Sequence, residues 1–142
     1  MLAHLDSFRN YKKFNTTTNQ WLPLWPPRNI TTTPNLVAFG NRVFAIGGGD
    51  ETFHPTPRLQ VADAHSYAWT FLDQQYNVPF PQEQHSLTQA DGRIYLTGGS
   101  YGDTSGEDTK RVLSFDGVHW RVEQPLLHKR SAHVSVTCQI PG

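Results

Sequence analysis

The side chains of this sequence that are best suited to metal binding are seven histidines. None of them falls into the His-x-Glu or His-Glu-x-x-His spacing that brings metal ligands and a general base onto one helix face. The pattern therefore predicts no metal site and no cofactor. The seven are His4, His54, His65, His85, His119, His128 and His133.

Patterns for nucleophilic catalysis and phosphate binding are equally weak. The single cysteine, Cys138, lies in the apolar β-type stretch 134–138, where a buried and unreactive thiol is expected. The run Gly98-Gly99-Ser100-Tyr101-Gly102 has the Gly-x-Ser-x-Gly spacing, but no helical pattern follows it, so it does not predict a nucleophile elbow. The run Gly47-Gly48-Gly49 is not followed by Gly-Lys-Ser/Thr, so it does not predict a phosphate loop. We expect no catalytic residue.

Composition narrows the range of partners. Twelve Lys and Arg balance twelve Asp and Glu, so the formal net charge is zero, which argues against a nucleic-acid-binding protein. No apolar run has the length of a secretory signal or a bilayer span, so we expect a cytoplasmic protein with no membrane partner. Asn15 and Asn29 begin glycosylation sequons, a pattern that Thr-rich loops also produce by chance.

The chain repeats itself at a spacing of 51 residues. An apolar stretch that ends in Gly47-Gly48 aligns with one that ends in Gly98-Gly99, and 98 − 47 = 51. The spacing of Trp69 and Trp120 is the same, 120 − 69 = 51. Two independent landmarks that share one offset indicate a structural repeat.

Each repeat has the pattern of four short strands separated by turn residues. The second strands of the two units, 43–46 and 94–96, are continuously apolar, which predicts sheets with both faces buried. Hairpin turns are expected at 40–41 and, with the stronger Asp-Gly signal, at 91–92. The fold class is therefore all-β. The expected strands are 36–39, 42–46, 59–62 and 68–72, then 85–89, 93–97, 112–115 and 119–122.

These repeats resemble those of the kelch family, whose unit joins an apolar strand and a Gly-Gly doublet to a spaced aromatic residue and a tryptophan. The resemblance implies β-propeller blades of four antiparallel strands. In such blades the glycines let a neighbouring strand approach closely and the tryptophan covers the gap. Pro34 departs from the pattern, because the other units carry His85 and His133 there. The matching residues are Phe44, Gly47, Gly48 and Trp69, then Tyr95, Gly98, Gly99 and Trp120.

The resemblance covers nearly the whole chain, which we interpret as one propeller segment, residues 1–142. It divides into the late strands of one blade (1–33), two full blades (34–81 and 82–127) and the first strand of a further blade (128–142). A closed propeller has about four to eight blades, so the ring is incomplete in one chain. Either several copies complete it as a homo-oligomer, or the chain belongs to a longer propeller.

The loops that follow the two glycine doublets are the candidate binding residues, because propellers carry recognition in their loops. Both loops are acidic and each contains an aromatic residue, which suits a basic peptide or protein partner. The competing interpretation is that they are solvated turns. The candidates are Asp50, Glu51, Phe53 and His54 in one loop and Tyr101, Asp103, Glu107 and Asp108 in the other.

The function that follows is non-enzymatic protein binding through the inter-strand loops, as the kelch resemblance implies. Two alternatives are open. One is a sugar-processing enzyme of the sialic-acid mutarotase or galactose-oxidase-like propeller type, and the other is a purely structural, self-assembling ring. Convergent carboxylates or arginines at the propeller axis would favour the enzyme, and exposed aromatic residues on one rim would favour binding.

Overall fold

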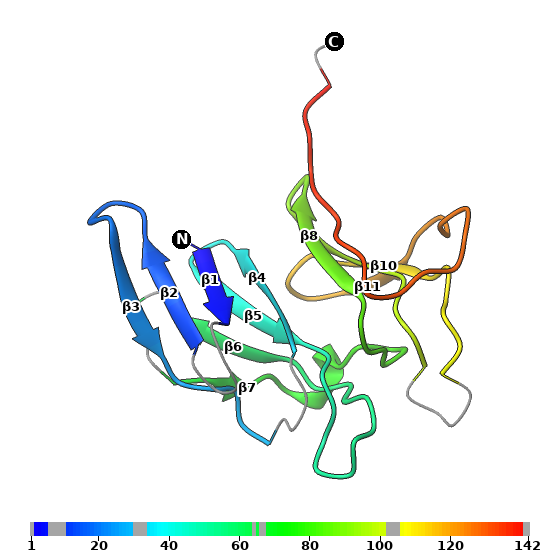
Figure 1. Ribbon diagram of the computed structural model, residues 1–142, viewed down its shortest axis with the longest axis horizontal. Coiled ribbons are helices and arrows are strands. Elements are labelled where there is room, and N and C mark those ends of the chain that lie inside the picture. The colour runs from blue at the N-terminus through cyan, green and yellow to red at the C-terminus, as the bar shows by residue number, and fades with distance from the viewer. Residues whose placement is uncertain are drawn as a thin grey trace.

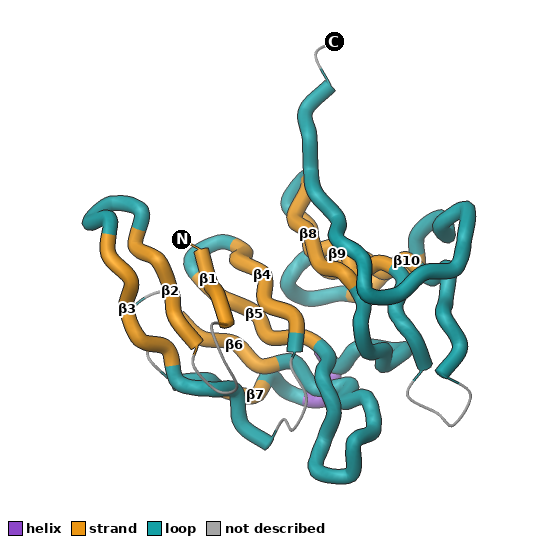
Figure 2. The backbone as a smooth tube through the Cα atoms, in the orientation of Figure 1, coloured by secondary structure: helices purple, strands orange, loops and turns teal. Residues whose placement is uncertain are grey.

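The computed structural model describes residues 2–5, 11–29, 34–63, 65, 68–101 and 106–140. Within these residues every strand pair is antiparallel, and the only helix is the short 3-10 turn η1 (Gln74–Tyr76). The expected all-β class is therefore confirmed. The strands form three sheets that follow one another in chain order across the molecule (Figures 1 and 2).

The first sheet has three strands, β1 (Leu2–Leu5), β2 (Tyr11–Asn15) and β3 (Gln20–Leu24), in that order. A four-residue turn joins β2 to β3, and the side-chain oxygen of Asn15 accepts hydrogen bonds from the backbone N–H of Thr17 and Thr18. The sequence had indicated two late strands here. It missed β1, which carries no glycine doublet to mark its end.

The second sheet contains β4 (Asn35–Phe39), β5 (Arg42–Ile46), β6 (Gln60–Asp63) and β7 (Thr70–Phe71), in sequential order. The two-residue turn at 40–41 pairs Phe39 with Arg42. Gly40 has φ +58°, a conformation that glycine adopts without steric cost.

The third sheet repeats this arrangement with β8 (Ser86–Ala90), β9 (Arg93–Thr97), β10 (Val112–Phe115) and β11 (Trp120–Val122). Its β8–β9 turn at 91–92 pairs Ala90 with Arg93. The expectation that this second strand is buried on both faces is wrong, because it alternates in burial: Ile94 and Leu96 are buried, whereas Tyr95 is half-buried. One face of β9 is thus only partly covered.

The core lies between the sheets, which explains why β5 is apolar throughout. Phe44 and Ile46 belong to a cluster shared with the third sheet, in which they meet Leu96 and Phe115 among others. Val43 and Ala45, on the opposite face, belong to a cluster shared with the first sheet. Because successive strand residues point to opposite faces, a strand between two covered faces must be apolar at every position.

The C-terminal segment 133–140 runs in an extended conformation beside β8 (Figure 1). The hydroxyl groups of Thr88 and Thr137 lie 3.0 Å apart, and the Ser135 N–H donates to Oγ of Ser86 at 2.7 Å. Cys138, expected to be buried, is exposed, because this lone segment has one face against β8 and β9 and no described strand on the other.

No helix in the described part of the chain is long and apolar enough to cross a membrane.

Candidate partner-binding site

Each glycine doublet receives a histidine from the segment that follows it. A Cβ atom placed on Gly47 would overlap Cε1 of His85, and one placed on Gly98 would lie 2.7 Å from Cε1 of His133. Both glycines have positive φ, +78° and +59°. A side chain at either position would therefore need both an unfavourable backbone conformation and space that an imidazole occupies.

Gly99 makes a similar close approach, because a Cβ atom there would lie 2.6 Å from the carbonyl oxygen of Glu83. Its N–H donates to the carbonyl of Arg130 at 2.8 Å. Gly48 has φ +82°, and its carbonyl accepts from the N–H of Thr56 at 2.9 Å. Gly47, Gly98 and Gly99 thus contact segments outside their own sheets, whereas the Gly48 hydrogen bond closes its own loop.

Burial lowers the pKa of His85 to about 4. The hydrogen bond from Nδ1–H to the Gln82 carbonyl, at 3.1 Å, raises the pKa by a smaller amount. The unfolded chain takes up this proton below about pH 6.5, whereas the folded chain resists it until about pH 4. Stability is therefore fully present above pH 6.5 and falls as the pH drops through this window. We expect the free energy of unfolding to be about 3 kcal/mol lower at pH 4 than at pH 7, as measured by urea unfolding at the two pH values. The His85→Gln variant should show a weaker pH dependence. An unchanged midpoint would contradict this burial.

The two repeat tryptophans make the same hydrogen bond in their respective sheets. The indole N–H of Trp69 donates to the carbonyl of Trp25, and that of Trp120 donates to the carbonyl of Tyr76 at 2.8 Å. The acceptor lies 44 residues before the tryptophan in both cases. Each tryptophan therefore attaches its sheet to the linker that precedes it.

Two arginines precede the third strand of their sheets and lie over aromatic rings. The guanidinium of Arg58 is 3.7 Å from the centroid of Phe71, and that of Arg111 is 3.9 Å from the centroid of Phe80. Cations above aromatic faces are attracted by the ring quadrupole. Arg58 thus joins the start of β6 to β7, and Arg111, which also lies 5.5 Å from the ring centroid of Tyr101, joins the start of β10 to the linker before β8 and to the second acidic loop.

The first acidic loop, residues 50–54 between β5 and β6, is organised by Asp50. One carboxylate oxygen accepts from the N–H of Thr52 at 2.8 Å, its hydroxyl at 2.6 Å and the N–H of His54 at 3.1 Å. The Thr52 hydroxyl bond, followed by the backbone bonds from His54 and Thr52, holds the pKa of Asp50 below its usual value. Asp50 therefore shapes the loop, while Glu51 and Phe53 extend into solvent, with Phe53 69% exposed.

The second acidic loop lies between β9 and β10. Tyr101 is half-buried, and its N–H donates to the carbonyl of Glu107 at 3.0 Å. Glu107 is exposed and lies 3.8 Å from Nζ of Lys129. Asp108 is half-buried and forms a backbone bridge with Ser100. Asp103 lies outside the described residues.

The first loop and the described ends of the second, up to residue 101 and from residue 106, lie on the same side of the molecule, at the ends of neighbouring sheets (Figure 1). This is the side opposite the β4–β5 and β8–β9 turns. The structure thus brings the two sequence-predicted loops to one rim.

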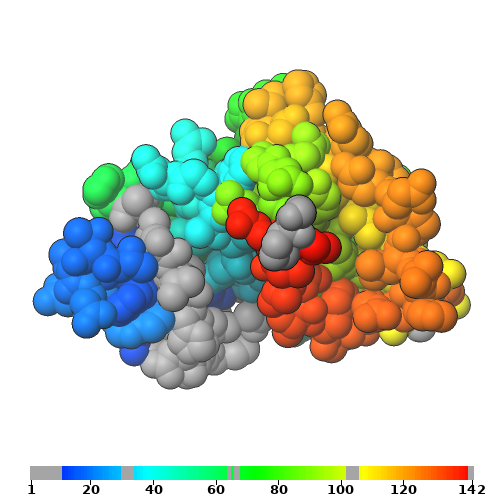
Figure 3. Space-filling model, turned by 90° about the horizontal axis from the view of Figure 1, so that it is seen from above, coloured from blue at the N-terminus to red at the C-terminus, as the bar shows by residue number. Residues whose placement is uncertain are grey.

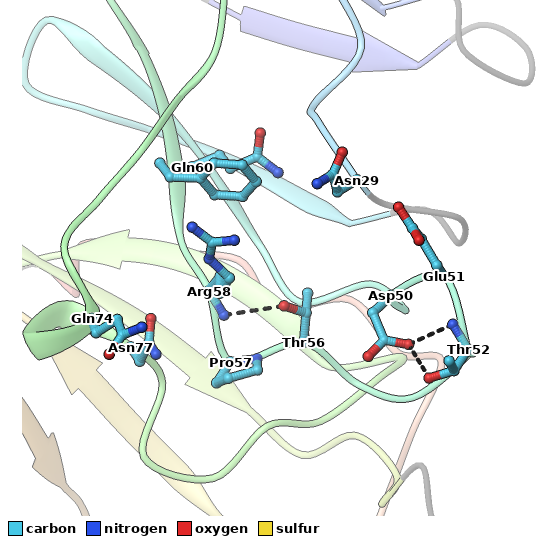
Figure 4. Close-up of a pocket in the computed structure, with 11 residues that line it drawn as sticks. Asn29, Asp50, Glu51, Thr52, Thr56, Pro57, Arg58, Gln60, Gln74 and Asn77 are labelled. Carbon is cyan, nitrogen blue, oxygen red and sulfur yellow. Dashed lines mark hydrogen bonds between the residues drawn. The ribbon is translucent and has the colours of Figure 1, made fainter.

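An open cleft of about 660 Å³ lies beside the first loop (Figure 4). Asp50, Glu51 and Arg58 place charges of both signs along it, and the ring of Phe71 forms an apolar patch. Sequence reasoning missed Gln74 and Asn77, which also line it. They follow β7 in a linker without a motif, and only folding brings that linker to the loop.

The described residues contain no group of three or more His, Cys, Asp or Glu side chains placed to hold a metal ion. His85 and His133, which the sequence places in equivalent positions, each lie against a glycine doublet instead.

Comparison with known proteins places these features in a family context. No protein-family model matches the chain. The human "Rab9 effector protein with kelch motifs" is 29% identical over 85 residues, which cover 58% of this chain and 23% of that protein. The Danio rerio protein of the same name is 32% identical over 85 residues, 58% of this chain and 24% of its own length. The matched region thus spans about a quarter of these relatives.

The fold itself matches that of a solved kelch-type propeller, YjhT. The TM-score is 0.66 at 15% identity, and the match covers 90% of this chain and 42% of YjhT. The same architecture is indicated by the repeat spacing, the glycine doublets, the four-stranded antiparallel sheets and these relatives. The chain is built from kelch-type β-propeller repeats.

Proposed function

We propose that this chain is a kelch-type protein-interaction module that binds a protein or peptide partner through the loops between the second and third strands of its blades. The observation that carries the proposal is that the two acidic loops project from one side, with a cleft beside the first (Figures 1 and 4). The curated relatives that match it are named as effectors of Rab9, which supports a protein partner.

The chemistry of this surface favours a partner with basic side chains. Asp50 stays ionised because its loop donates several hydrogen bonds to it, and Glu51 stands beside it in the cleft wall. A lysine or arginine that enters the cleft would meet these carboxylates. Phe53, exposed at the tip, provides an apolar contact of the kind that contributes most to binding energy at interfaces.

A peptide selection tests this proposal. The chain is used to select ligands from a random peptide library, and the affinities of the selected peptides are measured by fluorescence anisotropy. We expect Lys- and Arg-containing peptides whose affinity falls several-fold in Glu51→Gln/Glu107→Gln and about tenfold in Phe53→Ala. High salt should also weaken binding, because exposed charges are screened.

The matched control is Asp63→Asn/Asp91→Asn, which changes the net charge by the same amount on the opposite rim. Asp63 pairs in register with Arg42, next to the β4–β5 turn, and Asp91 lies in the β8–β9 turn. Both carboxylates are exposed. The control should bind like the unmodified chain. An equal loss of peptide affinity in both double variants would contradict loop-mediated recognition. So would an affinity that none of the loop substitutions changes.

A sugar-processing enzyme is the second candidate, favoured by the fold of YjhT, a sialic acid mutarotase. The cleft offers the carboxylate of Asp50 and the guanidinium of Arg58. The test is the rate at which sialic acid anomers interconvert, followed by NMR with and without the chain. An acceleration that Arg58→Ala abolishes would favour the enzyme over the binding module.

A further inference from the structure

Arg58 and Arg111 occupy equivalent places just before the third strands of their sheets and have the same backbone anchor. The N–H of Arg58 donates to the hydroxyl of Thr56 at 3.2 Å, and the N–H of Arg111 donates to that of Thr109 at 3.1 Å. Both threonines are buried. The backbone at each arginine is therefore held in the same way, and the surroundings of each side chain determine what its guanidinium can bind.

The two guanidinium groups differ in how far they are enclosed. That of Arg111 lies 3.9 Å from the ring centroid of Phe80 and 5.5 Å from that of Tyr101, and its Nη1 atom is buried. Arg58 is exposed and lines the cleft beside the first acidic loop (Figure 4). Its guanidinium lies 3.7 Å from the ring centroid of Phe71. Arg111 therefore belongs to the interior, whereas Arg58 presents its charge to a ligand that enters the cleft.

In the part of the chain that the structure describes, the Arg58 guanidinium makes neither a hydrogen bond nor an ion pair. Asp50 lines the same cleft, but its carboxylate is held by the loop through Thr52 and His54. Stacking on a ring fixes the plane of a guanidinium and leaves the N–H donors at its edge available. Arg58 is thus positioned for a ligand carboxylate, which an arginine can bind through two parallel hydrogen bonds.

The other charges in the cleft select the kind of ligand. Asp50 and Glu51 place two carboxylates in the same cleft as Arg58, so a doubly charged phosphate would meet stronger repulsion than a singly charged carboxylate. The same two groups attract a cation. A ligand with one carboxylate and one basic group therefore complements the cleft better than a ligand of either charge alone. The amide side chains that line the cleft are neutral: Asn29, Gln60, Gln74 and Asn77.

We propose that the cleft binds a pair of oppositely charged side chains from a peptide partner, with the carboxylate on Arg58 and the basic group beside Asp50 and Glu51. This inference rests on the proposed function and deepens it, because it names an acidic residue next to a lysine or arginine as the feature that the partner presents. The cleft volume of about 660 Å³ lies within the range of about 300–1,000 Å³ that is typical of small-ligand pockets. Two adjacent side chains therefore have room to enter.

NMR titration of the ¹⁵N-labelled chain with short peptides tests this pairing. The probes are acetyl-Lys-Asp-amide and acetyl-Lys-Asn-amide, which differ in one carboxylate. We expect saturable shifts at the backbone amides of Arg58, Gln74 and Asn77 with the Asp probe, and binding at least about fivefold weaker with the Asn probe. Non-specific attraction to the acidic loops would give the opposite order, because the Asn probe carries a net positive charge.

Three results of this titration would overturn the proposal. The first is equal affinity for the two probes, and the second is the absence of a saturable shift with either. The third is a free-acid form of acetyl-Lys-Asn that binds as tightly as acetyl-Lys-Asp-amide, because it would assign the subsite to a C-terminal carboxylate instead of a side chain.

Three variants assign the difference between the probes to Arg58. Arg58→Gln should remove the difference, and Arg58→Lys, which keeps the charge but not the planar pair of donors, should retain only part of it. The matched control is Arg42→Gln, at an exposed arginine that begins β5. The adjacent β4–β5 turn lies on the face seen in Figure 3, opposite the acidic loops, so this control should discriminate between the probes as the unmodified chain does.

A preference for the Asp probe that persists in Arg58→Gln would overturn the proposal. If that variant does not fold, Arg58→Lys decides the matter, because an undiminished preference there would equally contradict binding through the guanidinium donors.

The outcomes separate this proposal from the proposed function. The peptide selection tests the loops through Glu51, Phe53 and Glu107, whereas the dipeptide titration tests Arg58. Selected peptides that depend on Phe53 but not on Arg58 would overturn the subsite and leave loop-mediated binding in place. Dipeptides that depend on Arg58, together with selected peptides that none of the loop substitutions affects, would overturn loop-mediated binding and leave the subsite in place.

Discussion

Replacing Trp69 with alanine is expected to lower the free energy of unfolding by about 3–5 kcal/mol. The indole is 2% exposed, packs in the cluster shared by the first and second sheets, and donates to the carbonyl of Trp25. Its removal would leave a large cavity and one buried carbonyl without its donor. The measurement is urea unfolding followed by far-UV circular dichroism, which does not depend on the indole signal.

Trp25→Ala is the matched control, because the Trp25 side chain is 65% exposed while its carbonyl remains in place. This change should stay within about 0.5 kcal/mol. Trp120→Ala should fall between the two, since Trp120 is half-buried and stacks on Phe115 with centroids 4.8 Å apart. Losses below about 0.5 kcal/mol at both Trp69 and Trp120 would refute their architectural role.

Replacing Gly47 with alanine is expected to cost about 2–5 kcal/mol. The positive φ accounts for about 1–2 kcal/mol, and the overlap with the imidazole of His85 adds a packing cost of about 1–3 kcal/mol. The His85 side chain is 3% exposed and lies against Gly47 of the second sheet. It therefore cannot rotate into solvent to make room for the new methyl group. Urea unfolding is again the measurement.

Two controls separate the causes of this loss. Gly92→Ala has a similar φ, +71°, but no atom lies within 4 Å of the added Cβ, so it should show the backbone cost alone. In Gly47→Ala/His85→Ala the overlap with the imidazole is gone, although the Gln82 carbonyl oxygen remains 3.2 Å from the added Cβ. The combined loss should therefore be smaller than the sum of the single losses. Equal losses of unfolding free energy in Gly47→Ala and Gly92→Ala, together with additive losses in the double variant, would contradict the close approach of the His85 imidazole to Gly47.

The repeat made much of this architecture predictable. Strands 42–46, 93–97 and 112–115 begin and end where expected, because two-residue turns and continuous apolar runs are local signals. Gly47 and Gly98 could be anticipated as close-approach positions for the same reason. The blade boundaries, the cytoplasmic location and the use of the sequons stay predictions.

What the sequence did not reveal depends on neighbours that are distant along the chain. Cys138 lies in an apolar stretch, yet it is exposed, because among the described residues its segment has neighbours on one face alone. Trp21 matches Trp69 in type, but Trp21 is 51% exposed whereas Trp69 is 2% exposed. The cleft next to Asp50 combines three separate segments, and no local pattern predicts that convergence.

The most direct test of the account is a nuclear Overhauser measurement between each histidine and the glycine on which it packs. We predict strong cross-peaks from Hε1 of His85 to the α-protons of Gly47, and from Hε1 of His133 to those of Gly98. These contacts join each glycine doublet to the segment that follows its sheet. Gly47 and Gly98 signals without a contact to either imidazole would contradict this packing between kelch units.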